Sequence, residues 1–122
     1  MRAPCQAVVW YLLPAVGAEL ARELGGRGMQ QKEIAKRLGI TPASVSQYIN
    51  GTRGSEVKLG KGSLAAVKRL AGEVETGKAD EAKMIRAVCG ICRIAWRERT
   101  LCGHHARMHT CSTCSDGRMR CR

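Results

Sequence analysis

Apolar residues recur every three or four positions through most of the chain, which is the spacing of helices with one buried face. Glycines and short polar segments separate four such stretches, at residues 14–24, 30–38, 42–49 and 63–74. A fifth stretch begins near Glu81 and would direct Met84, Ile85 and Val88 inward before a cysteine-rich region. The pattern therefore predicts an all-α fold.

The first helix would begin at Pro14, because proline suits the first turn of a helix, and "GGRG" would end it. Its buried face is expected to consist of Ala15, Ala18, Leu20, Ala21 and Leu24. The apolar run at residues 7–18 also has features of a signal peptide. Since that run is too short to span a bilayer, and cleavage after it would destroy the helix, we favour a cytoplasmic protein with no membrane association.

The next helix, starting near Gln30, would place Ile34, Ala35 and Leu38 on one buried face. Its polar residues Glu33, Lys36 and Arg37 are expected to point to solvent. Gly39 should end this helix, because a left-handed backbone is needed there and glycine adopts it without strain.

The helix that follows has clear start and stop signals. Ile40 should pack inward, Thr41 offers a hydroxyl as N-cap, and Pro42 takes the first helical position. The buried stripe would be Val45, Tyr48 and Ile49. The segment "NGTRG" would end the helix at residues 50–51.

Together these positions match the twenty-residue helix-turn-helix motif, counted from Gln31, with a small residue at Ala35 and the turn glycine at Gly39. Its apolar positions are Ile34, Leu38, Ile40, Val45 and Tyr48. The segment resembles the Cro/C1-type (XRE) DNA-binding domain over residues 7–75. It is also similar to predicted archaeal transcription regulators that carry a cysteine near the start, as Cys5 stands here, and a cysteine-bearing tail. The alternative is a helical hairpin from an unrelated bundle.

The resemblance implies a five-helix bundle whose third helix enters the major groove of double-stranded DNA. It places Pro42, Ala43 and Gln47 toward the bases, and Gln47 can make a bidentate contact with adenine. Because direct readout by such short side chains is sparse, we expect a homodimer on two half-sites or a contribution from DNA shape. The full predicted DNA-contacting set is Gln31, Thr41, Pro42, Ala43, Ser44, Ser46, Gln47, Asn50, Thr52 and Arg53. Among these, Thr41, Ser46, Asn50, Thr52 and Arg53 are suited to phosphate contacts.

Composition agrees with a polyanionic partner. The 122 residues carry a formal net charge of +11, and the sequence pI is about 9.9. A surface that only aids solubility is the alternative explanation of this charge. Phe is absent and Trp and Tyr number two each, so the core should be aliphatic. We divide the chain into a DNA-binding domain at 1–75, a linker and connecting helix at 76–88, and a cysteine-rich tail at 89–122.

Seven cysteines in a short chain indicate metal-binding thiolates rather than a disulfide framework, because an odd number cannot all pair within one chain. Six lie in the last third, where two C-x-x-C pairs flank a C-x-x-H, and a tight turn is expected at each pair. The fold class is therefore a helix-turn-helix bundle followed by a small metal-binding module. The candidate ligands are Cys89, Cys92, Cys111, Cys114, Cys102, His105 and Cys5.

Three arrangements of these cysteines remain open. A structural zinc would use the two C-x-x-C pairs, with Cys102 and His105 as alternates or a second half-site. An iron–sulfur cluster would use Cys5, Cys89, Cys92 and Cys102, and would connect a sensor to the first helix. A metal-free thiol switch would close disulfides under oxidation. The paired spacing favours zinc over the iron–sulfur cluster.

Functions outside transcription regulation find less support in the sequence. The C-x-x-C pairs show no neighbouring strands of a thiol oxidoreductase, and Cys102 with His105 lacks an evident third partner, so we expect neither an enzyme nor a small-molecule substrate. A coactivator resembling the multiprotein bridging factors is the main alternative, although there the metal-binding segment precedes the helix-turn-helix. The arginines of the tail would either follow DNA phosphates or form a solvated face.

Overall fold

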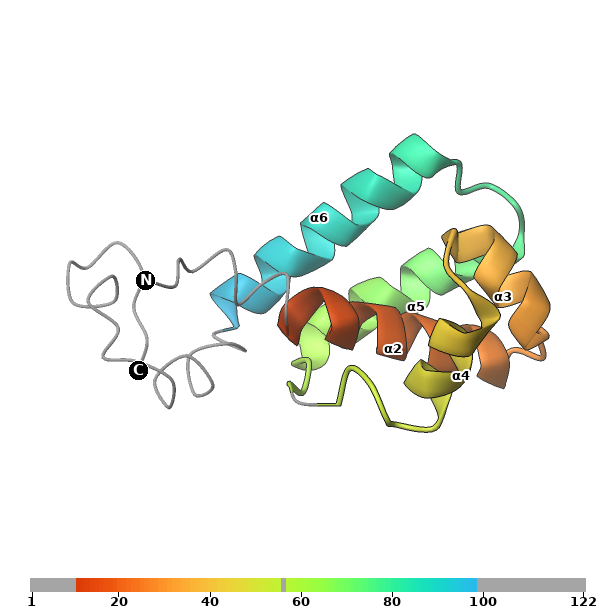
Figure 1. The fold of residues 1–122 in the computed structure, drawn as a ribbon. Coiled ribbons are helices and arrows are strands. Elements are labelled where there is room, and N and C mark those ends of the chain that lie inside the picture. The colour runs from red at the N-terminus through yellow and green to blue at the C-terminus, as the bar shows by residue number, and fades with distance from the viewer. Residues whose placement is uncertain (1–10, 56, 99–122) are drawn as a thin grey trace.

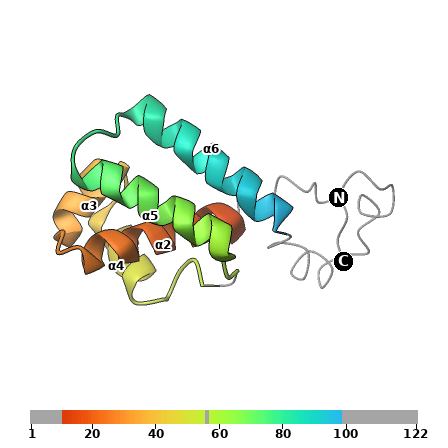
Figure 2. The same ribbon diagram turned by 180° about the vertical axis from the view of Figure 1, so that it is seen from behind.

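The computed structural model describes residues 11–55 and 57–98, and these segments form five helices without a strand. They are α2 (Leu13–Gly26), α3 (Gln31–Leu38), α4 (Pro42–Ile49), α5 (Lys61–Glu75) and α6 (Glu81–Arg97). Figure 1 shows α2 at the centre, α3 and α4 together at one end, and α5 and α6 side by side along one flank. The reverse view in Figure 2 shows the same arrangement.

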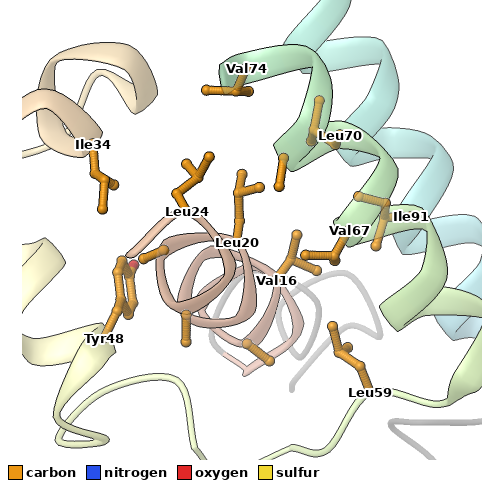
Figure 3. Packing of buried hydrophobic residues seen from close by; sticks show 14 of the residues in the cluster. Val16, Leu20, Leu24, Ile34, Tyr48, Leu59, Val67, Leu70, Val74 and Ile91 are labelled. Atoms are coloured by element: carbon orange, nitrogen blue, oxygen red, sulfur yellow. The ribbon is translucent and has the colours of Figure 1, made fainter. Parts of the chain in front are cut away.

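The core is aliphatic, as the composition predicts, and it is built around α2. All five residues expected on the buried face of α2 are buried, and so is Val16. Figure 3 shows Ile34 of α3, Tyr48 of α4 and Val67 of α5 directed toward this helix. Fully burying a valine or leucine side chain contributes about 1.5–3 kcal/mol, so Val16, Leu20 and Leu24 of this central helix contribute strongly to the bundle's stability.

Helix α6 corrects two expectations from the sequence. Ile85 was expected to point inward, but it is 58% exposed, and Ile91 and Ala95 are the buried residues of α6. A turn was expected at Cys89 and Cys92, but both cysteines lie inside the helix, which continues to Arg97. The expected boundary between residues 88 and 89 therefore falls within α6.

The end of α6 is fastened to the start of α5 by one carboxylate. Glu98 accepts hydrogen bonds from the backbone N–H groups of Gly62 (3.2 Å) and Ser63 (2.9 Å), and also from the Ser63 hydroxyl. The first N–H groups of a helix have no partner within it, so Glu98 takes the role of an N-terminal cap for α5. These hydrogen bonds, led by the one from the Ser63 hydroxyl, lower the pKa of Glu98 below its usual value.

Candidate nucleic-acid interface

The turn between α3 and α4 forms as the sequence predicts. Gly39 has a left-handed backbone with φ of 67°, and the Ile40 N–H donates to the Ala35 carbonyl oxygen at 3.0 Å. Ala35 is buried, and its small side chain suits the close approach of the two helices. The local signals therefore fix the direction in which α4 leaves the turn.

Helix α4 begins with the predicted cap. Thr41 has an extended backbone, and its hydroxyl oxygen accepts a hydrogen bond from the Ser44 N–H at 3.1 Å. The hydroxyl groups of Thr41 and Ser44 also lie 2.9 Å apart and share a hydrogen bond. Pro42 occupies the first turn of the helix. Both hydroxyls are thus engaged in starting the helix.

The inner face of α4 packs on α2. Val45 is fully buried, and Tyr48 is 9% exposed with its ring against Gly17. A Cβ atom added at Gly17 would lie 3.4 Å from two ring carbons of Tyr48, so the small residue allows this close packing. The buried stripe predicted from the sequence is confirmed for Val45 and Tyr48, and Ile49 is half-buried against the core.

The outer face of α4 carries short, uncharged side chains. Pro42, Ala43 and Gln47 are exposed, while Ser44 and Ser46 are half-buried. Gln31, at the start of α3, is also exposed. No charged residue occurs in "PASVSQYI", so the backbone of α4 can approach another molecule without long side chains in between. This shape suits insertion into a groove that admits a helix.

The segment after α4 carries polar groups close to the end of this helix. The Asn50 side-chain oxygen accepts hydrogen bonds from the N–H and the hydroxyl of Thr52, at 3.0 and 2.6 Å. The guanidinium carbon of Arg53 lies 5.5 Å from the centre of the Tyr48 ring, which is cation–π geometry. Arg53 is exposed and has no acidic partner within residues 11–55 and 57–98.

Stacking on Tyr48 was not predicted, because helical periodicity carries no information about a loop side chain that returns to the preceding helix. The aromatic ring holds the guanidinium beside α4 and leaves its N–H groups available. A guanidinium is well suited to phosphate, since it offers several donors in a fixed plane. Arg53 is therefore an exposed cation held close to α4, with a geometry that suits a phosphate contact.

Other arginines near this site have structural roles. Arg37 is exposed, as expected, and its guanidinium also donates to the Val74 carbonyl oxygen at 2.7 Å and to Glu33 at 2.8 Å. The hydrogen bond from Arg37 is the main reason that the pKa of Glu33 is lowered. Arg27 similarly joins the end of α2 to Glu75 and to the Lys68 carbonyl oxygen of α5. These contacts join the end of α2 and helix α3 to α5.

Of the candidate metal ligands, only Cys89 and Cys92 lie within the described residues, one helical turn apart on α6. Cys89 is exposed and Cys92 is half-buried, and both are free thiols. Burial raises the pKa of the Cys92 thiol, and the neighbouring Cys89 raises it further. Within the described residues no group of three or more His, Cys, Asp or Glu side chains could hold a metal ion. The remaining candidates, Cys5, Cys102, His105, Cys111 and Cys114, lie outside these residues.

Comparison with known families agrees with this geometry. A helix-turn-helix family model matches residues 19–58, from the second half of α2 through α3 and α4 to the segment before α5. The predicted helix-turn-helix is confirmed for this part of the chain, and the match supports binding of double-stranded DNA. No curated protein and no solved structure gives a significant match. None of the described helices has the length and apolar character needed to cross a bilayer.

Proposed function

We propose that the chain is a sequence-specific transcription regulator of the Cro/C1 type that binds double-stranded DNA as a homodimer in the cytoplasm. The observation that carries this proposal is the outer face of α4. A capped helix presents Pro42, Ala43 and Gln47 outward, and Arg53 is held beside it on the Tyr48 ring. An ordinary surface helix would carry lysine and glutamate at such positions.

In this proposal Gln47 reads an adenine and Ala43 contacts a thymine methyl group, while Arg53 binds a phosphate. The exposed residues Gln31 and Thr52, with Ser46 and the amide nitrogen of Asn50, are further candidates for backbone contacts. Two half-sites would compensate for the small number of base contacts on each copy.

We also propose that the cysteines of the C-terminal third bind a metal ion, and we favour zinc over an iron–sulfur cluster because the cysteines occur in pairs. Because Cys89 and Cys92 lie within α6, a metal ion bound by them would be attached to the helix that packs on α5. Oxidation of these two thiols to a disulfide finds less support. Cβ atoms three residues apart on a helix are about 5–6 Å apart, whereas a disulfide needs about 3.5–4.5 Å.

Selection of bound sequences from random DNA, followed by footprinting, tests the regulator. The natural chain should protect one defined site, and Gln47→Ala should lose about 1–3 kcal/mol of preference at one adenine position in each half-site. Gln30→Ala is the matched control. Gln30 is an exposed glutamine that makes no side-chain cap for α3, so the preference should stay unchanged.

A chain that binds all sequences equally, or that protects DNA only with a partner protein, would instead support the bridging-type coactivator. Unchanged base preference in Gln47→Ala would show that another residue reads the adenine.

A further inference from the structure

The exposed face of α6 carries a row of arginines. These three residues, which we call the arginine row, are Arg86, Arg93 and Arg97. Each of them stands two positions after a residue that packs in or against the core, and those residues are Met84, Ile91 and Ala95. Because each residue of a helix is turned by about 100° from the one before, two positions place the side chain on the opposite side of the helix. The arginine row therefore faces away from the core.

The positive charge of this row is neither interrupted nor offset within α6. Arg93 and Arg97 are four residues apart, so they are neighbours on the helix surface. Gly90 lies between Arg86 and Arg93, and a Cβ atom added there would meet open space. Helix α6 contains one acidic residue, Glu81 in its first turn. None of the three arginines forms an ion pair among the described residues.

This pattern differs from that of a helix face that only meets solvent. Such a face usually alternates acids and bases, because opposite charges three or four residues apart stabilise a helix and like charges destabilise it. In α2, Arg22 pairs with Glu19 at 3.0 Å. In α3, Arg37 pairs with Glu33 at 2.8 Å. The arginine row has no such partner among the described residues, so its charge is suited to an anion from another molecule.

DNA phosphate is the anion that fits this row. A guanidinium group offers several donors in one plane, which matches the oxygens of a phosphate. From Arg86 to Arg97 the row extends about 16 Å, since a helix rises about 1.5 Å per residue. Duplex DNA carries one negative charge for about every 1.7 Å of its axis, so a row of this length can meet several phosphates. The helix-turn-helix match independently supports DNA as a ligand of this chain.

The arginine row and the outer face of α4 lie on different sides of the molecule. In Figures 1 and 2, α6 runs along the top and α4 lies near the bottom. Helix α4 packs on α2, whereas α6 packs on α5 and on α2, and both helices turn their exposed residues outward. A straight duplex seated on α4 would therefore not reach the arginine row.

We propose that the arginine row is a second DNA-binding surface, which binds the phosphates of a second duplex while α4 is seated on the first. One chain would then bridge two segments of DNA. The second contact is independent of sequence, because the arginines meet phosphates rather than base edges. The inference rests on the proposed function for the contact at α4, and it adds a means of bringing distant DNA segments together.

Capture of one duplex by another tests this proposal. A duplex with the selected site is fixed to beads, loaded with the full chain and washed, and a labelled duplex without the site is added. We expect the natural chain to retain the labelled duplex. Arg86→Gln/Arg93→Gln/Arg97→Gln should weaken this retention about tenfold or more and leave protection of the first site unchanged. Arg86→Lys/Arg93→Lys/Arg97→Lys keeps the charge and should preserve most of the retention at low salt.

Lys58→Gln/Lys68→Gln/Lys78→Gln is the matched control, because it removes the same charge from three residues outside α6. These lysines are exposed and form no ion pair among the described residues. This control should retain the labelled duplex nearly as well as the natural chain does. Its comparison with the glutamine variant of the arginine row separates a localised surface from the effect of net charge alone.

Equal retention by the natural chain and the glutamine variant would overturn the proposal, and so would an equal loss in the lysine control. If the glutamine variant instead lost only its binding to vesicles containing phosphatidylserine, the row would belong to an anionic membrane surface. A natural chain that protects its site but retains no second duplex would reject the second surface alone. A chain that protects no site, yet binds duplex DNA through the arginine row, would reject the regulator alone.

Discussion

Gly54 shows how one residue can hold the segment after α4 against the core. Its backbone is left-handed, with φ of 77°, and it lies directly on α2. A Cβ atom at this position would lie 2.8 Å from the Cβ of Ala18 and would overlap the Pro14 carbonyl oxygen. Both the backbone conformation and the space therefore require glycine, and the segment carrying Arg53 is positioned by this contact.

We predict that Gly54→Ala lowers the free energy of unfolding by about 3 kcal/mol, combining left-handed strain with overpacking. Gly28→Ala is the control, because Gly28 has φ of 91° but no atom near the added Cβ. It should cost only about 1 kcal/mol, which is the strain alone. Urea denaturation of both variants checks this, and equal losses would contradict the role of the contact with α2.

At the scale of elements, the attachment of α6 to α5 depends on the charge of Glu98. Its carboxylate accepts hydrogen bonds at the start of α5, where the helix dipole also favours a negative charge. Since Ser63 is fully buried, its hydroxyl would lose its partner if Glu98 were changed. The pair α5 and α6 should therefore be less stable in acid than at neutral pH.

We predict that Glu98→Gln lowers the free energy of unfolding by about 1 kcal/mol at pH 7, the usual size of a helix-cap effect. Because the pKa of Glu98 is lowered in the folded state, its stabilising effect is complete above the unfolded value near 4.3. The effect is lost as the pH falls through the folded value. The natural chain and the variant should thus converge in urea denaturation as the pH falls from the unfolded value through the lowered folded value. A difference that persists unchanged in acid would show that charge is not its cause.

The sequence predicted α3, α4 and their turn because every signal there is local. A cap at Thr41, a glycine at the left-handed position and one apolar stripe per helix are readable within a few residues. Helix α6 was harder to predict, because its apolar residues are not confined to one face. Periodicity cannot tell which of them meet the core, so Ile85 was wrongly expected to point inward. The cysteine pair was read as a turn because C-x-x-C spacing is compatible with both a turn and one turn of helix.

Two further contacts could not be predicted from the sequence. They are the hydrogen bonds between Glu98 and Ser63 and the stacking of Arg53 on Tyr48. The first joins residues 35 positions apart, and the second depends on the path of a loop. Both are tertiary contacts between residues whose types are common on surfaces. By contrast, Pro42, Ala43 and Gln47 are exposed, as expected from the position of the buried stripe, whereas Ser44 and Ser46 are half-buried.

At the scale of the whole molecule, the net charge of +11 predicts DNA affinity that falls steeply with salt. We expect Arg53→Ala to weaken binding to preferred and unrelated sequences alike and to reduce the slope of log K against log salt by about 0.9, the value for one phosphate contact. Arg53→Lys should largely keep the slope, because it keeps the charge while losing the planar stacking on Tyr48. Fluorescence anisotropy with labelled DNA at several salt concentrations measures both. A loss confined to the preferred sequence would instead assign Arg53 to a base.

In α4 the residues that maintain the fold are separate from the exposed residues, and this separation affects which substitutions the chain can accept. Val45 and Tyr48 and the Thr41 cap maintain the fold, whereas Ala43 and Gln47 are exposed and make no side-chain hydrogen bond within the described residues. Exchanging these two residues should leave folding almost unaffected, since surface substitutions usually change stability by less than about 0.5 kcal/mol. If Ala43 and Gln47 read the bases as we propose, the preferred DNA sequence can change while the scaffold stays the same. Duplicated copies of such a gene could acquire separate sets of targets by changes at only two codons.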